Sequence, residues 1–343
     1  MKRLLFITLA LLAAIPAFAQ DPQKAAAEAA AALTAAPDAP KVVEKPVYWT
    51  KWAKTDLKFT QTSLTNWAAG GFNTFTLATY IDANSNYAKE KTTWTNRLQM
   101  DYGFLYSADK PIVQKNLDRI YFKSDYGYKT TVKNLTYTIS FDFKTQFDNN
   151  YTYGTPKSDG EEEPTRQDWL NARKLKSGFL SPANSQLGIG IKWIPNKWLT
   201  INASPLTGGF VIARDERLRK NYGMELREEG LDKSDGSNYR PARFELGAKV
   251  TAEAKVKINN NISYETQLIL FSNYLKNPQN LRVNWDNRLE WKLAKYFTMN
   301  FNTFLIYDDT IRITDDAHPD GFRAIQFKEF LQFGFTYTFG KKK

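Results

Sequence analysis

The residues best suited to chemistry lie in one short segment near the C-terminus. His318 is the only histidine of the chain, and it stands among carboxylates in the sequence DDAHPDG. A histidine beside a carboxylate can act as a general base, as a hydrolase or an acyl-transfer enzyme requires. The same segment is typical of a solvated loop, because Pro319, Asp320 and Gly321 are ordinary turn residues. The candidate cluster comprises Asp308, Asp309, Asp315, Asp316 and His318.

The carboxylates of this cluster also raise the question of a metal site. Calcium prefers several oxygen ligands of this kind, but the spacing here is not that of a calcium-binding loop. The chain has no cysteine, which excludes disulfides, thiolate ligands and a cysteine nucleophile. Gly188 and Gly190 form only a fragment of a dinucleotide-binding motif, since no helix follows them. The sequence therefore predicts no metal and no cofactor.

The elements that would position any site are β-strands. In LTYTISFDFKTQF (135–147) apolar and aromatic residues alternate with polar ones. An alternation with a period of two predicts a strand. Similar alternations recur from Tyr48 onward, and several exceed the about five or six residues that are usual in soluble proteins. The predicted strands are residues 54–65, 72–86, 93–106, 118–129, 134–147, 183–194, 198–213, 242–257, 260–272, 281–293, 296–308 and 323–339.

The links between these strands alternate in length. Short links such as TTVK and PNK lie at one end, and mostly longer links, including Ser107–Leu117, lie at the other. The two longest are residues 149–182 and 214–241. Short periplasmic turns and long outer loops are expected of outer-membrane barrels, whereas a soluble sandwich has no reason to collect its long loops at one end.

The strand count depends on residues 198–213. These fit as one strand with a bend at Pro205 and at the Gly208-Gly209 pair, because proline and glycine inside a strand often mark a bulge. We therefore predict an all-β fold, a closed antiparallel up-and-down transmembrane β-barrel of twelve strands. Ten and fourteen strands are the alternatives.

The polar rows of the predicted strands should face the lumen, and the apolar rows should face lipid. The inward rows carry both signs of charge, which suggests ion pairs that fill or narrow the interior. Twelve strands also lie between small filled barrels and open porins. We therefore predict a narrow or closed lumen, with the 149–182 loop as a candidate gate. The candidate lumen-lining residues are Arg97, Asp101, Arg119, Lys123, Asp142, Lys144, Arg282, Asp286, Arg288 and Glu290.

The N-terminus predicts export. A positively charged start and an apolar segment precede Ala17-Phe18-Ala19, which is typical of a signal-peptidase site. Residues 1–19 are therefore a predicted signal peptide, residues 20–47 an Ala/Pro-rich periplasmic tether, and residues 48–340 the barrel. No later run of about eighteen apolar residues occurs, which excludes membrane-spanning helices. The predicted location is the outer membrane of a Gram-negative bacterium.

The charge and the last strand suggest the partners. The formal net charge is +11, but the cations are spread among carboxylates, so we predict no nucleic-acid binding. Outer-membrane lipids and lipopolysaccharide are the expected surroundings. The last strand alternates Phe333, Phe335, Tyr337 and Phe339, and it is similar to the terminal signal that the barrel-assembly machinery reads. The sequence identifies no small-molecule ligand.

Several motifs resemble a known family. They include SLTNWAAGGFNTF (63–75), SPANSQLGIG (181–190) and LFSNYLKNPQN (270–280). Together they resemble an outer-membrane barrel family catalogued as domain of unknown function 3078, from about Trp52 to Phe339. The resemblance implies export, a barrel fold and the outer membrane. It implies no reaction.

Two classes of function remain open from the sequence. The first is a non-enzymatic barrel for narrow-substrate transport, ligand binding or envelope structure. The second is an outer-membrane barrel enzyme, a hydrolase or an acyl-transfer enzyme, that uses the loop carboxylates and His318. The substitution His318→Ala separates the two, because it would inactivate such an enzyme and leave a transporter intact.

Overall fold

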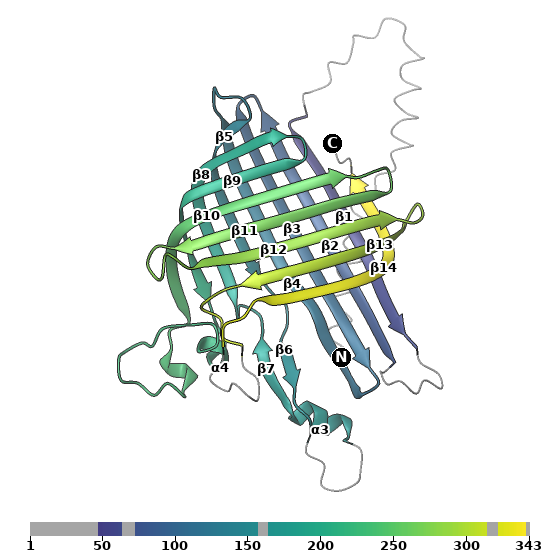
Figure 1. The fold of residues 1–343 in the computed structure, drawn as a ribbon, viewed down its shortest axis with the longest axis vertical. Coiled ribbons are helices and arrows are strands. Elements are labelled where there is room, and N and C mark those ends of the chain that lie inside the picture. Colours follow the sequence, from purple (N-terminus) through teal and green to yellow (C-terminus); the bar gives the residue numbers. More distant parts are fainter. Residues whose placement is uncertain (1–46, 64–72, 157–163, 314–321, 341–343) are drawn as a thin grey trace, which may run out of the picture. The chain divides into compact units, whose positions relative to one another are not determined.

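A computed structural model describes residues 47–63, 73–156, 164–313 and 322–340 (Figure 1). The chain divides into two units, Met1–Val47 and Tyr48–Lys343. The predicted signal peptide and the predicted tether up to residue 46 lie outside the described residues. Among those described, no helix is long and apolar enough to cross a membrane.

Twelve strands of the second unit form a closed barrel, as predicted. Each strand is antiparallel to its neighbours, and the ring order is β1-β14-β13-β12-β11-β10-β9-β8-β5-β4-β3-β2. Neighbours in the ring are thus neighbours in sequence, which confirms the up-and-down topology. The barrel strands are β1 (Trp49–Thr62), β2 (Thr74–Lys89), β3 (Thr92–Ser107), β4 (Lys110–Lys129), β5 (Leu135–Thr145), β8 (Ala183–Asn196), β9 (Leu199–Ile212), β10 (Ala242–Lys257), β11 (Ile262–Asn273), β12 (Leu281–Lys292), β13 (Phe297–Tyr307) and β14 (Gln326–Gly340).

The two faces of the barrel wall differ in chemistry. In β5, Ile139 is 48% exposed whereas its neighbour Ser140 is 3% exposed. Buried Ser140 accepts a hydrogen bond of 2.8 Å from the amide of Asn202 in β9, so polar groups are satisfied on the inner face. Isolated exposed hydrophobic residues are normal on soluble proteins, but here they cover the outer face of strand after strand. This outward apolar and inward polar alternation is the pattern of a transmembrane barrel.

One predicted link is wrong. Residues 107–117 were expected to form a long outer loop, but β3 ends at Ser107 and β4 begins at Lys110. The paired strands reach this far through two irregularities, one beside Gly103 and one beside Tyr106. The segment KPIVQKNL has no alternation strong enough to predict a strand. In the structure, hydrogen bonds to β3 hold this part of β4, because β5 pairs only with residues 120–129.

The bend in β9 lies at Pro205. Residues 199–212 form one strand, as predicted. Gly247 of β10 pairs with Thr207 and Lys249 pairs with Ser204, so β9 contains an extra residue here. A proline cannot donate to the ladder, and a bulge is the position that tolerates it. The pair Gly208-Gly209 keeps the register with both neighbouring strands, so these glycines mark no bulge.

Short elements stand on the long loops at one end of the barrel (Figure 1). The loop after β5 carries β6 (Asn150–Tyr153), α3 (Arg166–Asn171) and β7 (Arg173–Ser177), and β6 pairs with β7. The loop after β9 carries α4 (Glu216–Arg219) and the 3-10 helix η2 (Gly236–Asn238). This second loop has an apolar core of its own, formed by Val211, Ala213, Met224 and Tyr239.

The opposite end of the barrel has an aromatic belt. Tryptophan and tyrosine are enriched at membrane interfaces, where an apolar ring with a polar edge is favoured. Here they lie beside the short turns, and Trp49 contacts Trp94 with a separation of 5.9 Å between ring centroids. The belt marks the level of one bilayer surface. Its exposed members are Trp49, Trp94, Tyr128, Tyr137, Trp193, Trp198, Trp291, Tyr296 and Tyr337.

Candidate functional site in the barrel interior

Arg97 of β3 joins opposite walls of the barrel. Its Nε and Nη2 atoms donate to the two carboxylate oxygens of Asp82 on β2, both at 2.8 Å. Its Nη1 atom donates to Glu265 on β11, also at 2.8 Å. The path from β3 to β11 runs over β4, β5, β8, β9 and β10, so the two strands are half of the ring apart. The Arg97 side chain therefore crosses the lumen.

Arg119 of β4 makes a second connection of this kind. It donates from Nε to Asp101 on β3 at 2.8 Å and from Nη1 to Asp286 on β12 at 3.1 Å. Strands β4 and β12 also stand on opposite sides of the ring. Arg288 of β12 completes the group, with its Nη2 atom 3.6 Å from a carboxylate oxygen of Asp101. Its guanidinium also lies 4.5 Å from the centre of the Tyr80 ring.

Three lysines add further ion pairs between strands that are not neighbours. Lys123 of β4 donates to Glu253 of β10 at 2.7 Å. Lys249 of β10 pairs with Asp142 of β5, and Lys54 of β1 pairs with Glu290 of β12. Of the charged residues predicted to line the lumen, Lys144 has no ion pair within 4.0 Å among the described residues. The other predicted lumen residues all form ion pairs, and several of these pairs join strands that are not neighbours in the ring.

One small cavity lies beside these pairs. A cavity of ≈ 10 Å³ is lined by Tyr80, Asp101 and Arg288 together with Asn302 and Phe304. A volume of this size holds about one water molecule. One nitrogen of Arg288 and the amide nitrogen of Asn302 have no hydrogen-bond partner in the described part of the chain. A bound water would satisfy such groups, so the cavity suits a solvent molecule rather than a solute.

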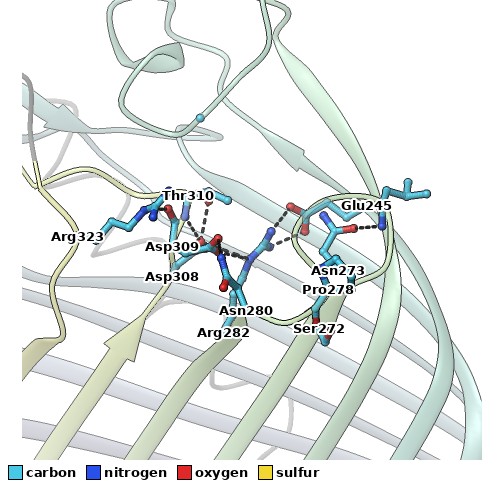
Figure 2. Close-up of polar contacts among 12 residues, drawn as sticks. Glu245, Ser272, Asn273, Pro278, Asn280, Arg282, Asp308, Asp309, Thr310 and Arg323 are labelled. Carbon is cyan, nitrogen blue, oxygen red and sulfur yellow. Dashed lines mark hydrogen bonds and ion pairs between the residues drawn. The ribbon is translucent and has the colours of Figure 1, made fainter.

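A second cluster lies at the loop end of the barrel, which we call the outer mouth (Figure 2). Arg282 of β12 donates to both carboxylate oxygens of Glu245 on β10, at 2.7 Å each. Its Nε atom lies 3.3 Å from Asp308. Asp309 accepts a bond of 2.6 Å from the amide of Asn280, and the backbone carbonyl of Asp309 accepts one of 2.9 Å from Arg323. Bidentate hydrogen bonds between a guanidinium and a carboxylate are strong and directional. The cluster holds the ends of two outer loops against the barrel wall.

Arg243 of β10 brings the loop after β9 into this cluster. It donates to Glu245 at 3.0 Å and to the hydroxyl of Thr310 at 3.0 Å. Its Nη1 atom also donates to the backbone carbonyls of Tyr222 and Gly223. One buried guanidinium therefore connects the barrel wall with two outer loops. We call the residues Arg243, Glu245, Arg282, Asp308, Asp309 and Thr310 the outer-mouth cluster.

The two longest loops also contact each other. The Tyr222 hydroxyl donates to the carbonyl of Lys176 in β7 at 3.0 Å, and burial raises the pKa of Tyr222 to about 12. The phenol therefore stays protonated and remains a donor at neutral pH. The backbone amide of Arg214 donates to the carbonyl of Leu180 at 2.9 Å. The two loops are thus connected to each other as well as to the outer-mouth cluster.

The catalytic and metal hypotheses concern partly the same loop. Asp315, Asp316 and His318 lie outside the described residues. Asp308 and Asp309 are described, and both serve as acceptors within the outer-mouth cluster. Among the described residues there is no group of three or more His, Cys, Asp or Glu placed to hold a metal ion.

Several interior partners were not anticipated from the sequence. Glu265 is the clearest case, because the inward row of β11 also carries Ile269 and buried Phe271, which hides the polar alternation. Asp82 and Glu253 lie in predicted strands with a regular alternation of polar and apolar residues. Assigning the polar row of each strand to the lumen predicts both as interior residues. Arg243 and Glu245 differ from these partners, because the alternation along β10 does predict that both point inward.

These features define a class of protein. A closed ring of long antiparallel strands, an apolar outer face and an aromatic belt are the features of an outer-membrane β-barrel. Residues 59–151 match a family whose description is protein of unknown function (DUF3078). This match confirms, over those residues, the family resemblance that the sequence motifs indicate.

Comparison with other proteins adds the following findings. No curated protein matches the chain. The translocator domain of autotransporter NalP from Neisseria meningitidis is 11% identical, with a TM-score of 0.34, and the match covers 93% of this chain and 98% of that one. The NanC porin is 8% identical, with a TM-score of 0.36 and coverages of 84% and 100%. OmpT of Vibrio cholerae is 6% identical, with a TM-score of 0.28 and coverages of 87% and 100%.

Proposed function

We propose that this protein is an exported outer-membrane barrel of a Gram-negative bacterium whose lumen is sealed at rest. Solutes would pass only when the ion pairs in the interior separate, and the outer-mouth cluster would control that step. The observation that carries the proposal is the pair of connections made by Arg97 and Arg119 between opposite walls. The proposal is non-enzymatic, and it favours a gated narrow path over an open diffusion pore.

Electrostatics supports a sealed interior. An open pore keeps its charged side chains hydrated, but here both Arg97 and Asp82 have side chains less than a tenth exposed. Removing one partner of such a pair leaves an uncompensated buried charge at a cost of about 3–5 kcal/mol. A solute that crosses this level must separate several pairs or replace their contacts. Passive diffusion should therefore be negligible.

The arrangement of layers supports control from outside. The outer-mouth cluster lies between the interior pairs and the loops, and Arg243 connects it to the loop after β9. A ligand that displaced this loop would also disturb the contacts of Arg243 with Glu245 and Thr310. The outer-mouth cluster is thus where recognition of a solute would couple to opening.

Single-channel recording on the refolded barrel tests the proposal. The unmodified protein should show no steady current in a planar bilayer. The double variant Arg97→Ser, Arg119→Ser removes both connections and shortens both side chains, so it should show stepwise currents. The matched control is Arg217→Ser with Arg227→Ser, two exposed loop arginines whose removal should leave the bilayer silent. Large steady currents from the unmodified protein would refute a sealed lumen.

A further inference from the structure

The turn end of the barrel carries mostly positive exposed charge. The five links at this end are residues 90–91, 130–134, 197–198, 258–261 and 293–296, and Glu90 is their only acidic residue. Each link contains an exposed lysine or follows one directly. These lysines are Lys91, Lys133, Lys197, Lys257 and Lys295.

The opposite end has a mixed surface. The loop after β9 exposes charges of both signs, namely Arg217, Lys220 and Arg227 together with Glu216 and Glu228. The positive character of the turn end is therefore a local feature and not a consequence of the net charge of the chain. Mixed charges compensate one another within a loop, whereas a row of one sign attracts a partner of the other sign.

The geometry of the lysines indicates the shape of the partner. The five links connect β2 to β3, β4 to β5, β8 to β9, β10 to β11 and β12 to β13, so they are distributed around the ring. Lys51 of β1 adds an exposed cation beside the β1–β14 seam. A bound protein would contact one sector of such a ring. A lipid leaflet surrounds the barrel on every side.

The level of the lysines indicates the chemistry of the partner. They lie beside the aromatic belt, which marks the headgroup level of the bilayer. Lys295 lies 5.1 Å from the centre of the Tyr296 ring. Lys89, which directly precedes the first link, lies 5.3 Å from the centre of the Tyr48 ring. A lysine packed on an interfacial ring holds its ammonium group among the headgroups while its alkyl stem contacts apolar surface. Lipid phosphates are the anions available at this depth.

We infer that the lysine ring of the turn end, which we define as Lys91, Lys133, Lys197, Lys257 and Lys295, binds the headgroups of anionic phospholipids in the adjacent leaflet. The ring would gather these lipids around the barrel and fix its depth and orientation. This inference requires that the barrel spans a bilayer, but it does not depend on whether the lumen is sealed.

The belt tryptophans provide the measurement. Trp49, Trp94, Trp193, Trp198 and Trp291 stand beside the lysine ring, and brominated lipids quench the fluorescence of tryptophans that they contact. Vesicles of equal phosphatidylglycerol and phosphatidylcholine are prepared with bromine on one lipid or on the other. The two quenching levels give the relative association of the anionic lipid. A preference of about fivefold is expected, which corresponds to about one lysine near an anionic surface.

The test compares three variants with the unmodified protein. The variant with all five ring lysines changed to glutamine should lose the preference, and the variant with all five changed to arginine should keep it. A control with Lys174, Lys176, Lys220, Lys233 and Lys276 changed to glutamine removes the same charge from the outer loops and should retain the preference. Each protein is first shown to be folded by its heat-modifiable migration in a detergent gel.

Two outcomes would overturn the inference. One is a preference near unity in the unmodified protein, or a preference that the glutamine ring variant retains. The other concerns peptidoglycan, which is also anionic and would lie on this side of the membrane. If the ring variant lost cosedimentation with purified peptidoglycan sacculi while its lipid preference was unchanged, the ring would be a cell-wall contact and not a lipid site.

Discussion

At the scale of single residues, Arg97 shows how one side chain connects opposite walls of the barrel. Its three hydrogen bonds at 2.8 Å reach a neighbouring strand and the far wall. A guanidinium suits this position because its fixed fork of donors can contact two carboxylates in different directions. A lysine presents a point charge and would keep only part of this set. The same side chain that crosses the lumen therefore also ties the walls together.

We expect Arg97→Ala to lower the free energy of unfolding by about 3–5 kcal/mol, because Asp82 and Glu265 would lose a buried partner. Arg97→Lys should lie between this variant and the unmodified protein. The control is Arg217→Ala. It breaks the 2.7 Å ion pair between Arg217 and Asp215, and it should cost less than about 1 kcal/mol because the Arg217 side chain is 69% exposed. Urea unfolding in phosphatidylcholine vesicles measures all three. Equal costs for Arg97→Ala and Arg217→Ala would contradict the assigned role.

At the scale of elements, the strands were more predictable than the loops or the ion pairs. Strands such as β5 and β12 alternate regularly, so their faces follow from the sequence. Glu265, the partner of Arg97 on the far wall, could not be predicted. The pairing depends on ring closure and on the stagger of β3 against β11. The helix α3 has a capping box between Thr165 and Asp168, a signal that the sequence does contain. Its surroundings are polar, however, and local signals alone rarely specify so short a helix.

The loop after β9 offers a prediction about the outer mouth. Gly223 and Gly230 both have positive φ, +65° and +85°. A side chain at Gly223 would meet Arg243 Nη1 at 2.9 Å and the Thr310 carbonyl at 3.0 Å, whereas nothing lies within 4 Å of one at Gly230. Both alanine variants carry a backbone cost of about 1–2 kcal/mol. Only Gly223→Ala should also disturb the outer-mouth cluster.

Limited proteolysis measures this difference. Relative to the unmodified protein, Gly223→Ala should speed tryptic cleavage within residues 213–241 about tenfold more than Gly230→Ala does, because cleavage follows the population of the open loop. Because both substitutions lie in the same loop, the two variants share the same protease sites, the same membrane environment and a similar backbone strain. Equal acceleration by both variants would show that the loop does not depend on Arg243.

At the scale of the whole molecule, the solvent of the outer face decides between a membrane barrel and a soluble β-protein. Ile189 lies near the middle of β8 and is 52% exposed, and Val132 lies in the turn after β4 and is 61% exposed. In water, lysine at either position would cost little. In a bilayer, Ile189→Lys should cost about 2–4 kcal/mol and Val132→Lys about 0–1 kcal/mol, because the penalty depends on depth in the hydrocarbon. Reversible unfolding from vesicles measures both variants. Equal small costs at positions 132 and 189 would place the outer face in water, and the lipid-binding inference would then have no membrane to act on.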